Sequence, residues 1–338
     1  MPAHLLKPSI ACAALIAVTM LVACSPREET AEQTNENTAT ATPAHHEDVY
    51  RFTIGELSAV ALRDGSFTFP NDNKIFGAGR TPDEVAAVLS QAGLPESEVH
   101  LSIQPLLVEA PDRVLLFDTG AGATMGSDTG RLPASLAVAG IDPATVSDIF
   151  ISHSHGDHVN GLVNAEGAPA FPNAVIHISA PEWEFLKSLD ATTAAEQNGI
   201  TAYDALIAAV SPKVDAFTAG AELIPGLVQA VDIKGHTPGH SAYRISSAGS
   251  SLLYVGDSMH HFVLSVARPQ WTVTFDRDTA TAASSRSDLL ARSAESGQRL
   301  YAVHFPFPGL GRIERRPEGE PGFVWVAESS GGMHAAHR

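Results

Sequence analysis

Short apolar runs separated by turn residues begin at Val49 and dominate the early part of the chain. Arg63-Asp64-Gly65 gives a turn signal between two of these runs, and Thr81-Pro82 begins a predicted helix that stops at Gly93. We therefore predict a β-rich first part with strands over Tyr50–Ile54, Ser58–Leu62, Phe67–Phe69, Leu101–Glu109 and Arg113–Phe117, and a helix over Pro82–Gln91.

The second part alternates between strand-like and helix-like patterns. The predicted helices cover Pro181–Leu189, Ala202–Val210 and Thr279–Glu295. The predicted strands cover Asp148–Ser152, Ala174–Ile178, Val228–Ile233, Ala242–Ser246, Ser251–Val255 and Leu300–His304. Strands outnumber helices, and helices recur between them. This pattern favours an α/β fold in which two sheets have helices on their outer sides.

The N-terminus has the pattern of a secretory signal. Lys7 is followed by the apolar run Ile10–Ala23, which has the length of a signal-peptide core and is short for a membrane span. The run ends in Leu21-Val22-Ala23-Cys24, which resembles a bacterial lipobox. The resemblance implies a lipoprotein-type signal peptide over residues 1–23 and lipid attachment at Cys24. An ordinary signal with an incidental cysteine is the alternative.

Residues 24–48 are rich in Glu, Thr, Ala and Asn and have almost no large apolar side chain, so we expect a flexible tether. Residues 49–328 then form one predicted globular domain, and residues 329–338 a disordered tail. Together these features predict an exported protein that is lipid-anchored to a bacterial membrane, facing the periplasm or the cell exterior.

Charge and cysteine content restrict which partners and which metal ligands are expected. The net charge of -17 leaves no surplus of Lys and Arg to neutralise phosphates, so nucleic acid is not an expected partner. The two cysteines, Cys12 and Cys24, both lie near the N-terminus. A transition-metal site in the domain must therefore use histidine and carboxylate ligands.

Such ligands are concentrated in the segment His153-Ser154-His155-Gly156-Asp157-His158, directly after the apolar run Ile149–Ser152. Histidines two residues apart point the same way while the chain is extended, and a turn at Gly156 lets the next two ligands face a second point. Three imidazoles and a carboxylate suit zinc, manganese, iron or cobalt. We predict a metal site here.

This segment resembles the His-x-His-x-Asp-His signature of the metallo-β-lactamase superfamily, and the resemblance extends over nearly the whole domain. It implies an αββα sandwich of two mixed sheets flanked by helices, and two divalent metal ions, with zinc favoured over manganese, iron or cobalt. One metal would be held by His153, His155 and His240, and the other by Asp157, His158 and His304. Asp257 would bridge them, and Asp118 would orient a ligand histidine.

Two of these assignments have competitors in the sequence. His236 could be the ligand in place of His240, although His240 is favoured. His260 and His261 compete with His304, but they are more readily explained as substrate-contact or packing residues. The remaining candidate pocket residues are Trp271, Phe305 and Phe307.

The carboxylate at Asp257 argues against a dedicated β-lactamase, because family β-lactamases place Cys or Ser there. Segments around Trp271 and Phe305 are similar to the methyl parathion hydrolase and lactonase-like branch. The resemblance implies a hydrolase in which a bridging hydroxide attacks small ester, lactone or organophosphate-type substrates, with Asp157 and Asp257 as catalytic carboxylates. The alternatives are a β-lactamase, a glyoxalase II-like thioesterase or a di-iron redox enzyme of the same fold, and a non-catalytic metal-binding lipoprotein. A homodimer is left open.

Overall fold

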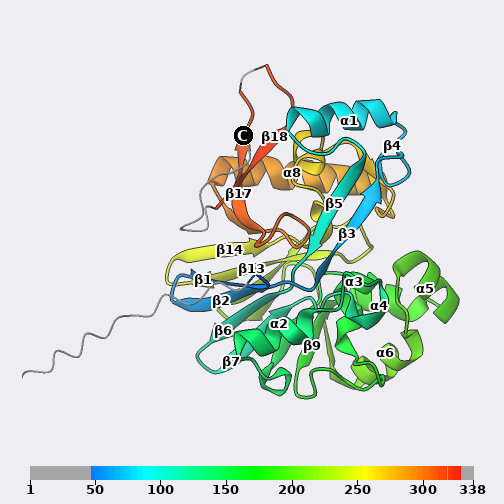
Figure 1. Cartoon of the computed structure of the whole chain (residues 1–338). Helices are drawn as coiled ribbons and strands as arrows, with labels where there is room; N and C mark the ends of the chain where they lie inside the picture. Colours follow the sequence, from blue (N-terminus) through cyan, green and yellow to red (C-terminus); the bar gives the residue numbers. More distant parts are fainter. Residues whose placement is uncertain (1–46, 318, 329–338) are drawn as a thin grey trace, which may run out of the picture. The chain divides into compact units, whose positions relative to one another are not determined.

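Two mixed sheets of seven strands each form the centre of the computed structural model, which describes residues 47–317 and 319–328 (Figure 1). The first sheet has the order β1-β2-β6-β7-β8-β9-β10, with bounds Val49–Ile54, Leu57–Leu62, Leu106–Ala110, Arg113–Phe117, Asp148–Phe150, Val175–Ser179 and Val214–Phe217. The second has the order β11-β12-β13-β14-β16-β17-β18, with bounds Glu222–Ile224, Val228–Asp232, Ser241–Ser247, Ser250–Tyr254, Arg299–Tyr301, Leu310–Arg315 and Phe323–Ala327.

Side-chain alternation along the strands explains how the two sheets pack. In β7, Leu115 and Phe117 belong to the apolar cluster between the sheets, whereas Leu116 belongs to the cluster on the outer face. Tyr243 and Tyr254 of the second sheet join the same inner cluster, so the two sheets share one core. Because both faces of the first sheet are covered at its centre, the parallel strand β7 is a nearly continuous apolar run in the sequence.

Helices complete the outer layers. The outer face of the first sheet packs against α2, α4, α5 and α6, and that of the second packs against α7 and α8. The predicted αββα sandwich is therefore confirmed. The helices α1 to α8 span Pro82–Gln91, Leu132–Ala139, Gly156–Val159, Ala180–Ser188, Ala191–Asn198, Tyr203–Val210, Leu264–Ala267 and Thr279–Ser296.

Two small sheets and α1 form a separate apolar cluster above the edge of the sandwich (Figure 1). β3 (Gly65–Pro70) pairs with β5 (Glu98–Ile103), and β4 (Phe76–Ala78) pairs with β15 (Thr272–Val273). α1 begins as predicted, because Thr81 and Glu84 form a capping box at its first turn.

The predicted single strand Leu101–Glu109 is wrong, since the chain divides it at Gln104-Pro105 into β5 and β6. β5 leaves the main sheet to pair with β3, whereas β6 pairs with β2. Gln104 fixes the division, because its buried amide donates to the carbonyls of Ala302 (3.0 Å) and Phe305 (2.9 Å).

The predicted signal peptide (1–23), Cys24, all but the end of the tether and the tail at 329–338 lie outside the described residues. Among the residues that are described, no helix has both the length and the apolar character needed to cross a membrane.

Candidate metal centre

Ligand-type side chains that follow the ends of strands lie at one edge of the sandwich. In the first sheet, β7 is followed by Asp118 and the parallel β8 by the segment His153–His158. In the second sheet, β14 is followed by Asp257 and the parallel β16 by His304. Parallel neighbours end at the same edge of a sheet, so each sheet presents its polar residues together.

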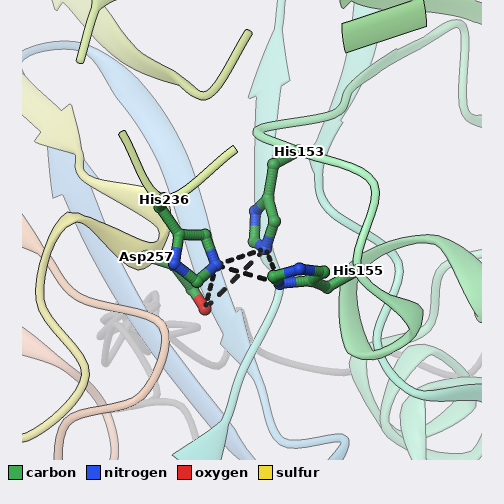
Figure 2. A group of neighbouring side chains, drawn as sticks. All are labelled: His153, His155, His236 and Asp257. Atoms are coloured by element: carbon green, nitrogen blue, oxygen red, sulfur yellow. Dashed lines mark hydrogen bonds and ion pairs between the residues drawn. The ribbon is translucent and has the colours of Figure 1, made fainter. Parts of the chain in front are cut away.

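The first group of converging side chains is His153, His155, His236 and Asp257 (Figure 2). Nε2 of His236 lies 3.1 Å from Nε2 of His153 and 2.9 Å from Nδ1 of His155. Oδ2 of Asp257 lies 3.5 Å from Nε2 of His236. Burial and the neighbouring imidazoles hold the pKa values of His153 and His155 well below their usual range, so these rings offer lone pairs to a cation.

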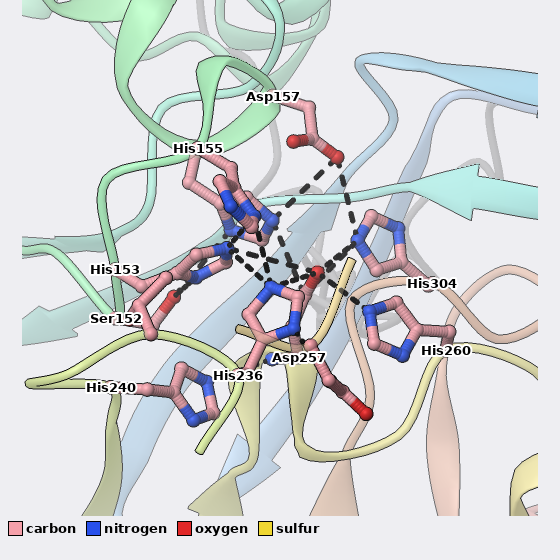
Figure 3. A network of polar contacts seen from close by, with 12 residues as sticks. Ser152, His153, His155, Asp157, His236, His240, Asp257, His260 and His304 are labelled. Atoms are coloured by element: carbon pink, nitrogen blue, oxygen red, sulfur yellow. Dashed lines mark hydrogen bonds and ion pairs between the residues drawn. The ribbon is translucent and has the colours of Figure 1, made fainter. Parts of the chain in front are cut away.

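The second group is Asp157, His158 and His304. Oδ2 of Asp157 lies 3.6 Å from Nε2 of His158 and 3.5 Å from Nε2 of His304. Oδ1 of Asp257 lies 3.2 Å and 3.0 Å from the same two nitrogens. Asp257 therefore faces both groups at once, and Figure 3 shows it in the middle of the network.

His240, which the sequence favoured as a ligand, does not take part in either group. Its Nδ1 lies 2.9 Å from the carbonyl oxygen of Ile233, and its Nε2 accepts the backbone N–H of Asp257 at 3.0 Å. Both ring nitrogens are thus engaged in holding backbone. The preference for His240 over His236 is corrected: His236 faces the cluster, and His240 supports the turn that carries Asp257.

Gly256 makes this arrangement of His240 feasible. Its φ is +49°, and a Cβ at this position would lie 2.6 Å from Nε2 of His240. A glycine is therefore required for the imidazole to reach the backbone N–H of Asp257.

Asp118 is fully buried and holds His158 by the nitrogen that points away from the cluster. Oδ2 of Asp118 lies 2.7 Å from Nδ1 of His158, and the carboxylate also accepts bonds from Ser152 and Tyr254. Burial would lower the pKa of His158, but the carboxylates of Asp257, Asp157 and Asp118 hold it well above its usual value. The local field therefore favours positive charge, as a cation site requires.

Asp276 plays the matching part for His236, and sequence reasoning missed it. Oδ1 of Asp276 lies 2.9 Å from Nδ1 of His236. The buried guanidinium of Arg286 donates to Oδ2 of the same carboxylate at 2.6 Å. Burial would raise the pKa of Asp276, but its bond with His236 and the charges of His260 and Arg286 lower it to about 2. The carboxylate is therefore ionised at neutral pH.

A cavity of about 600 Å³ opens onto the cluster, a volume in the range of small-molecule sites. Its apolar wall is formed by Phe67, Phe69, Leu101 and Phe275, and Arg277 lies at its polar side. Asp157, Asp257 and His304 line it together with His155 and His260.

Of the pocket residues predicted from the sequence, only His260 lines this cavity. Phe305 is fully buried in the core under the second sheet, and Phe307 packs against Arg63. Trp271 packs in the cluster around α1. Nδ1 of His261 accepts the backbone N–H groups of Val263 and Leu264 at the start of α7. The aromatic wall comes instead from β3 and from the loop after β15.

The buried donor set fits divalent cations. Nε2 of His158 and Oδ1 of Asp257 lie 3.2 Å apart, but neither atom forms a hydrogen bond among the described residues. A buried polar atom without a hydrogen bond costs about 1–3 kcal/mol, and a cation bound between these two atoms would remove that cost. Imidazole and carboxylate ligands without a thiolate suit zinc, with manganese, iron and cobalt as alternatives.

Comparison with known proteins gives a consistent result. Residues 101–304 match the model of the metallo-beta-lactamase superfamily. A probable metallo-hydrolase of Mycobacterium tuberculosis is 26% identical over 223 residues, which cover 54% of this chain and 69% of that protein. Among solved structures, AidC, described as a dizinc quorum-quenching lactonase in complex with a product, is 30% identical with a TM-score of 0.76, covering 83% of this chain and 97% of that one. AbOPH, described as a hydrolase in the beta lactamase superfamily, is 26% identical with a TM-score of 0.74, covering 84% and 99%.

Proposed function

This chain belongs to the metallo-β-lactamase superfamily and is a metal-dependent hydrolase, and on that premise we propose that it cleaves small ester and lactone substrates at a centre of two divalent cations. The position of Asp257 carries this proposal. Its two carboxylate oxygens face two separate groups of ligand-type side chains, which a mononuclear site would not need.

The proposed ligands follow from the two groups. His153, His155 and His236 would hold the first cation, and Asp157, His158 and His304 the second, with Asp257 shared between them. When bound, the two cations supply Lewis acidity, which polarises a carbonyl or phosphoryl oxygen and lowers the pKa of water. Zinc is the metal we expect, since the ligands are imidazoles and carboxylates.

Two side chains of the cavity can act on the substrate itself. Asp157 is only partly buried and lines the cavity, so its carboxylate can take up a proton and return it to the leaving group. His260 is buried with its Nε2 3.4 Å from Oδ2 of Asp257, and neither of its ring nitrogens forms a hydrogen bond among the described residues. We assign His260 to hydrogen bonding with a polar atom of the substrate.

The shape of the cavity supports an apolar group next to the scissile bond. Phe67, Phe69 and Phe275 form a continuous aromatic wall, with ring centroids of Phe69 and Phe275 5.8 Å apart. Such a wall suits an acyl or aryl group. The likeness to a dizinc lactonase at 30% identity favours lactones and esters, and organophosphate-type triesters are the second substrate class to test.

A hydrolysis panel tests the substrate class directly. Purified protein is loaded with zinc and assayed with lactones, aryl esters, paraoxon-type triesters, a thioester and a chromogenic cephalosporin. We expect turnover of lactones and aryl esters. Turnover restricted to the thioester or the cephalosporin would instead support the glyoxalase II-like or β-lactamase alternative.

Metal content and one variant test the centre. Elemental analysis should give close to two cations per chain, and one or none would contradict the proposal. Asp257→Ala should abolish hydrolysis, whereas Asp148→Asn, which changes a buried carboxylate at the opposite end of β8, should retain it. Lactone turnover that survives Asp257→Ala would rule out the shared carboxylate.

We also propose, from the sequence alone, that the protein is exported and anchored by a lipid on Cys24. In a bacterial host, labelled palmitate should enter the protein and Cys24→Ser should abolish both labelling and membrane fractionation. An unlabelled wild-type protein would leave an ordinary cleaved signal as the better explanation.

A further inference from the structure

Glu182 is a fully buried carboxylate at the start of α4 that the catalytic scheme does not use. Its Oε1 accepts the backbone N–H of Ser154 at 2.8 Å and the Ser154 hydroxyl at 2.6 Å. Its Oε2 accepts the Thr237 hydroxyl at 2.7 Å and the backbone N–H of Gly239 at 2.9 Å. Four hydrogen bonds thus satisfy the buried charge.

These four bonds join the two loops that carry the imidazoles of the first group. Ser154 lies between His153 and His155, and Thr237 directly follows His236. The first loop comes from one sheet and the second loop from the other. A single carboxylate therefore holds the three histidines in a fixed relation without being one of the proposed ligands.

The chemistry of the donors requires a carboxylate here. The N–H groups of Ser154 and Gly239 can only donate, and they approach different oxygens of Glu182. A glutamine would place an NH₂ group against one of these two N–H donors, so the backbone N–H of one loop would lose its acceptor.

Close packing between α4 and the second loop strengthens the connection. Ser179, the N-cap residue of α4, donates its hydroxyl to the carbonyl of Gly239 at 2.6 Å. A Cβ on Gly239 would lie 2.2 Å from Oγ of Ser179 and 2.3 Å from the backbone nitrogen of Glu182. The loop therefore reaches Glu182 only because residue 239 is a glycine.

We propose that Glu182 is a positioning residue that sets the cation affinity of the site formed by His153, His155 and His236. This inference rests on the proposed function, because it concerns one of the two proposed cation sites. The other site, with Asp157, His158 and His304, has no hydrogen bond to Glu182 and depends on Asp118 instead.

The test is a metal titration of the full-length holoenzyme and of Glu182→Gln. Zinc is removed with increasing chelator, and the retained cations per chain are measured; cobalt-substituted protein is followed by its absorption spectrum. We expect the cation at the site of His153, His155 and His236 to be removed from Glu182→Gln at a chelator concentration about 10–100-fold lower than from the wild type. The chelator concentration that removes the cation from the other site should be unchanged. Thermal unfolding of the metal-free proteins is recorded alongside.

Asp148→Asn is the matched control, because Asp148 is equally buried but bonds to Arg113, Ser147 and His177, away from the cluster. It should destabilise the metal-free protein and retain both cation affinities. Thr237→Val removes one of the four hydrogen bonds and is the variant to use if Glu182→Gln does not fold. It should also lower the cation affinity of the site formed by His153, His155 and His236.

If folded Glu182→Gln keeps the cation affinities of the wild type, the inference about Glu182 is wrong, but the proposed function is not affected. The same holds for Thr237→Val when that variant is used instead. An equal fall at both sites, matched by Asp148→Asn, would do the same, since it would reflect general destabilisation. A wild-type protein that binds fewer than two cations would overturn the proposed function and this inference with it.

Discussion

Asp276 holds Nδ1 of His236 at 2.9 Å, and the opposite ring nitrogen, Nε2, faces His153 and His155. Arg286 donates to the far oxygen of the same carboxylate, so a chain of three buried side chains fixes the imidazole. The contact also fixes the tautomer, because Nδ1 carries the proton and Nε2 keeps its lone pair.

Asp276→Asn should weaken binding of the first cation by about 10–100-fold, because an amide can present its NH₂ group to Nδ1 and no longer fixes the donor tautomer. The measurement is a competition titration with a zinc chelator. Asp278→Asn is the control, since Asp278 is the exposed cap of α8 and bonds to Thr281. Equal zinc affinity in Asp276→Asn and wild type would contradict the prediction.

His236→Ala and His240→Ala should separate a ligand from a structural histidine. The first should lower the metal content from two cations to one and abolish hydrolysis. The second should retain two cations but lower the free energy of unfolding by about 1–3 kcal/mol, because the N–H of Asp257 loses its acceptor. Elemental analysis and urea unfolding of both variants check this. The reverse pattern would restore His240 as the ligand.

Phe275→Ala should raise KM for substrates with a large acyl or aryl group by about tenfold or more, with little effect on substrates that have a small one. The reason is that its ring forms part of the aromatic wall of the cavity. Steady-state kinetics with a series of acyl chain lengths measures it. Trp271→Ala, outside the cavity wall, is the comparison, and a larger effect there would show that the wall is misplaced.

Asp148 should make stability depend on pH in the acid range. Burial would raise its pKa, but bonds from His177 and Ser147 and the Arg113 ion pair lower it to about 2. A pKa below the unfolded value of 3.8 stabilises the fold above pH 4, and this contribution, on the order of 2 kcal/mol, is lost as pH falls toward 2. Urea unfolding of wild type and Asp148→Asn should therefore differ at pH 7 and converge near pH 2; a constant difference would contradict this.

The sequence was sufficient to predict the sandwich and the convergence of most of the proposed ligands. Strand-end positions are visible locally, because an apolar run followed by His or Asp marks where a buried strand meets a loop, as at His153, Asp257 and His304. The choice between His236 and His240 was not visible, since both flank the same Thr-Pro-Gly turn. Only the packing against Gly256 and Ile233 decides it.

Supporting residues were missed for a different reason. Asp276 lies 40 positions from His236, and Glu182 lies 28 positions from Ser154. Their roles depend on how a loop and a helix fold back over the strand ends, which no local pattern encodes. The division of the predicted strand at Gln104 was missed for the same reason, because β3, the strand that pairs with β5, lies far back in the sequence.

The proposed ligands come from both sheets, which has a consequence for how this domain is stabilised. His153 to His158 follow a strand of the first sheet, whereas His236, Asp257 and His304 follow strands of the second. Cations bound by both sets would cross-link the two halves of the sandwich over a span of about 150 residues, in a domain whose sequence has no cysteine after Cys24. Bound metal would then stabilise the domain in the way that disulfides stabilise many exported proteins. The folding yield of the domain would accordingly follow the supply of metal ions where it folds, and not the oxidising power of that compartment.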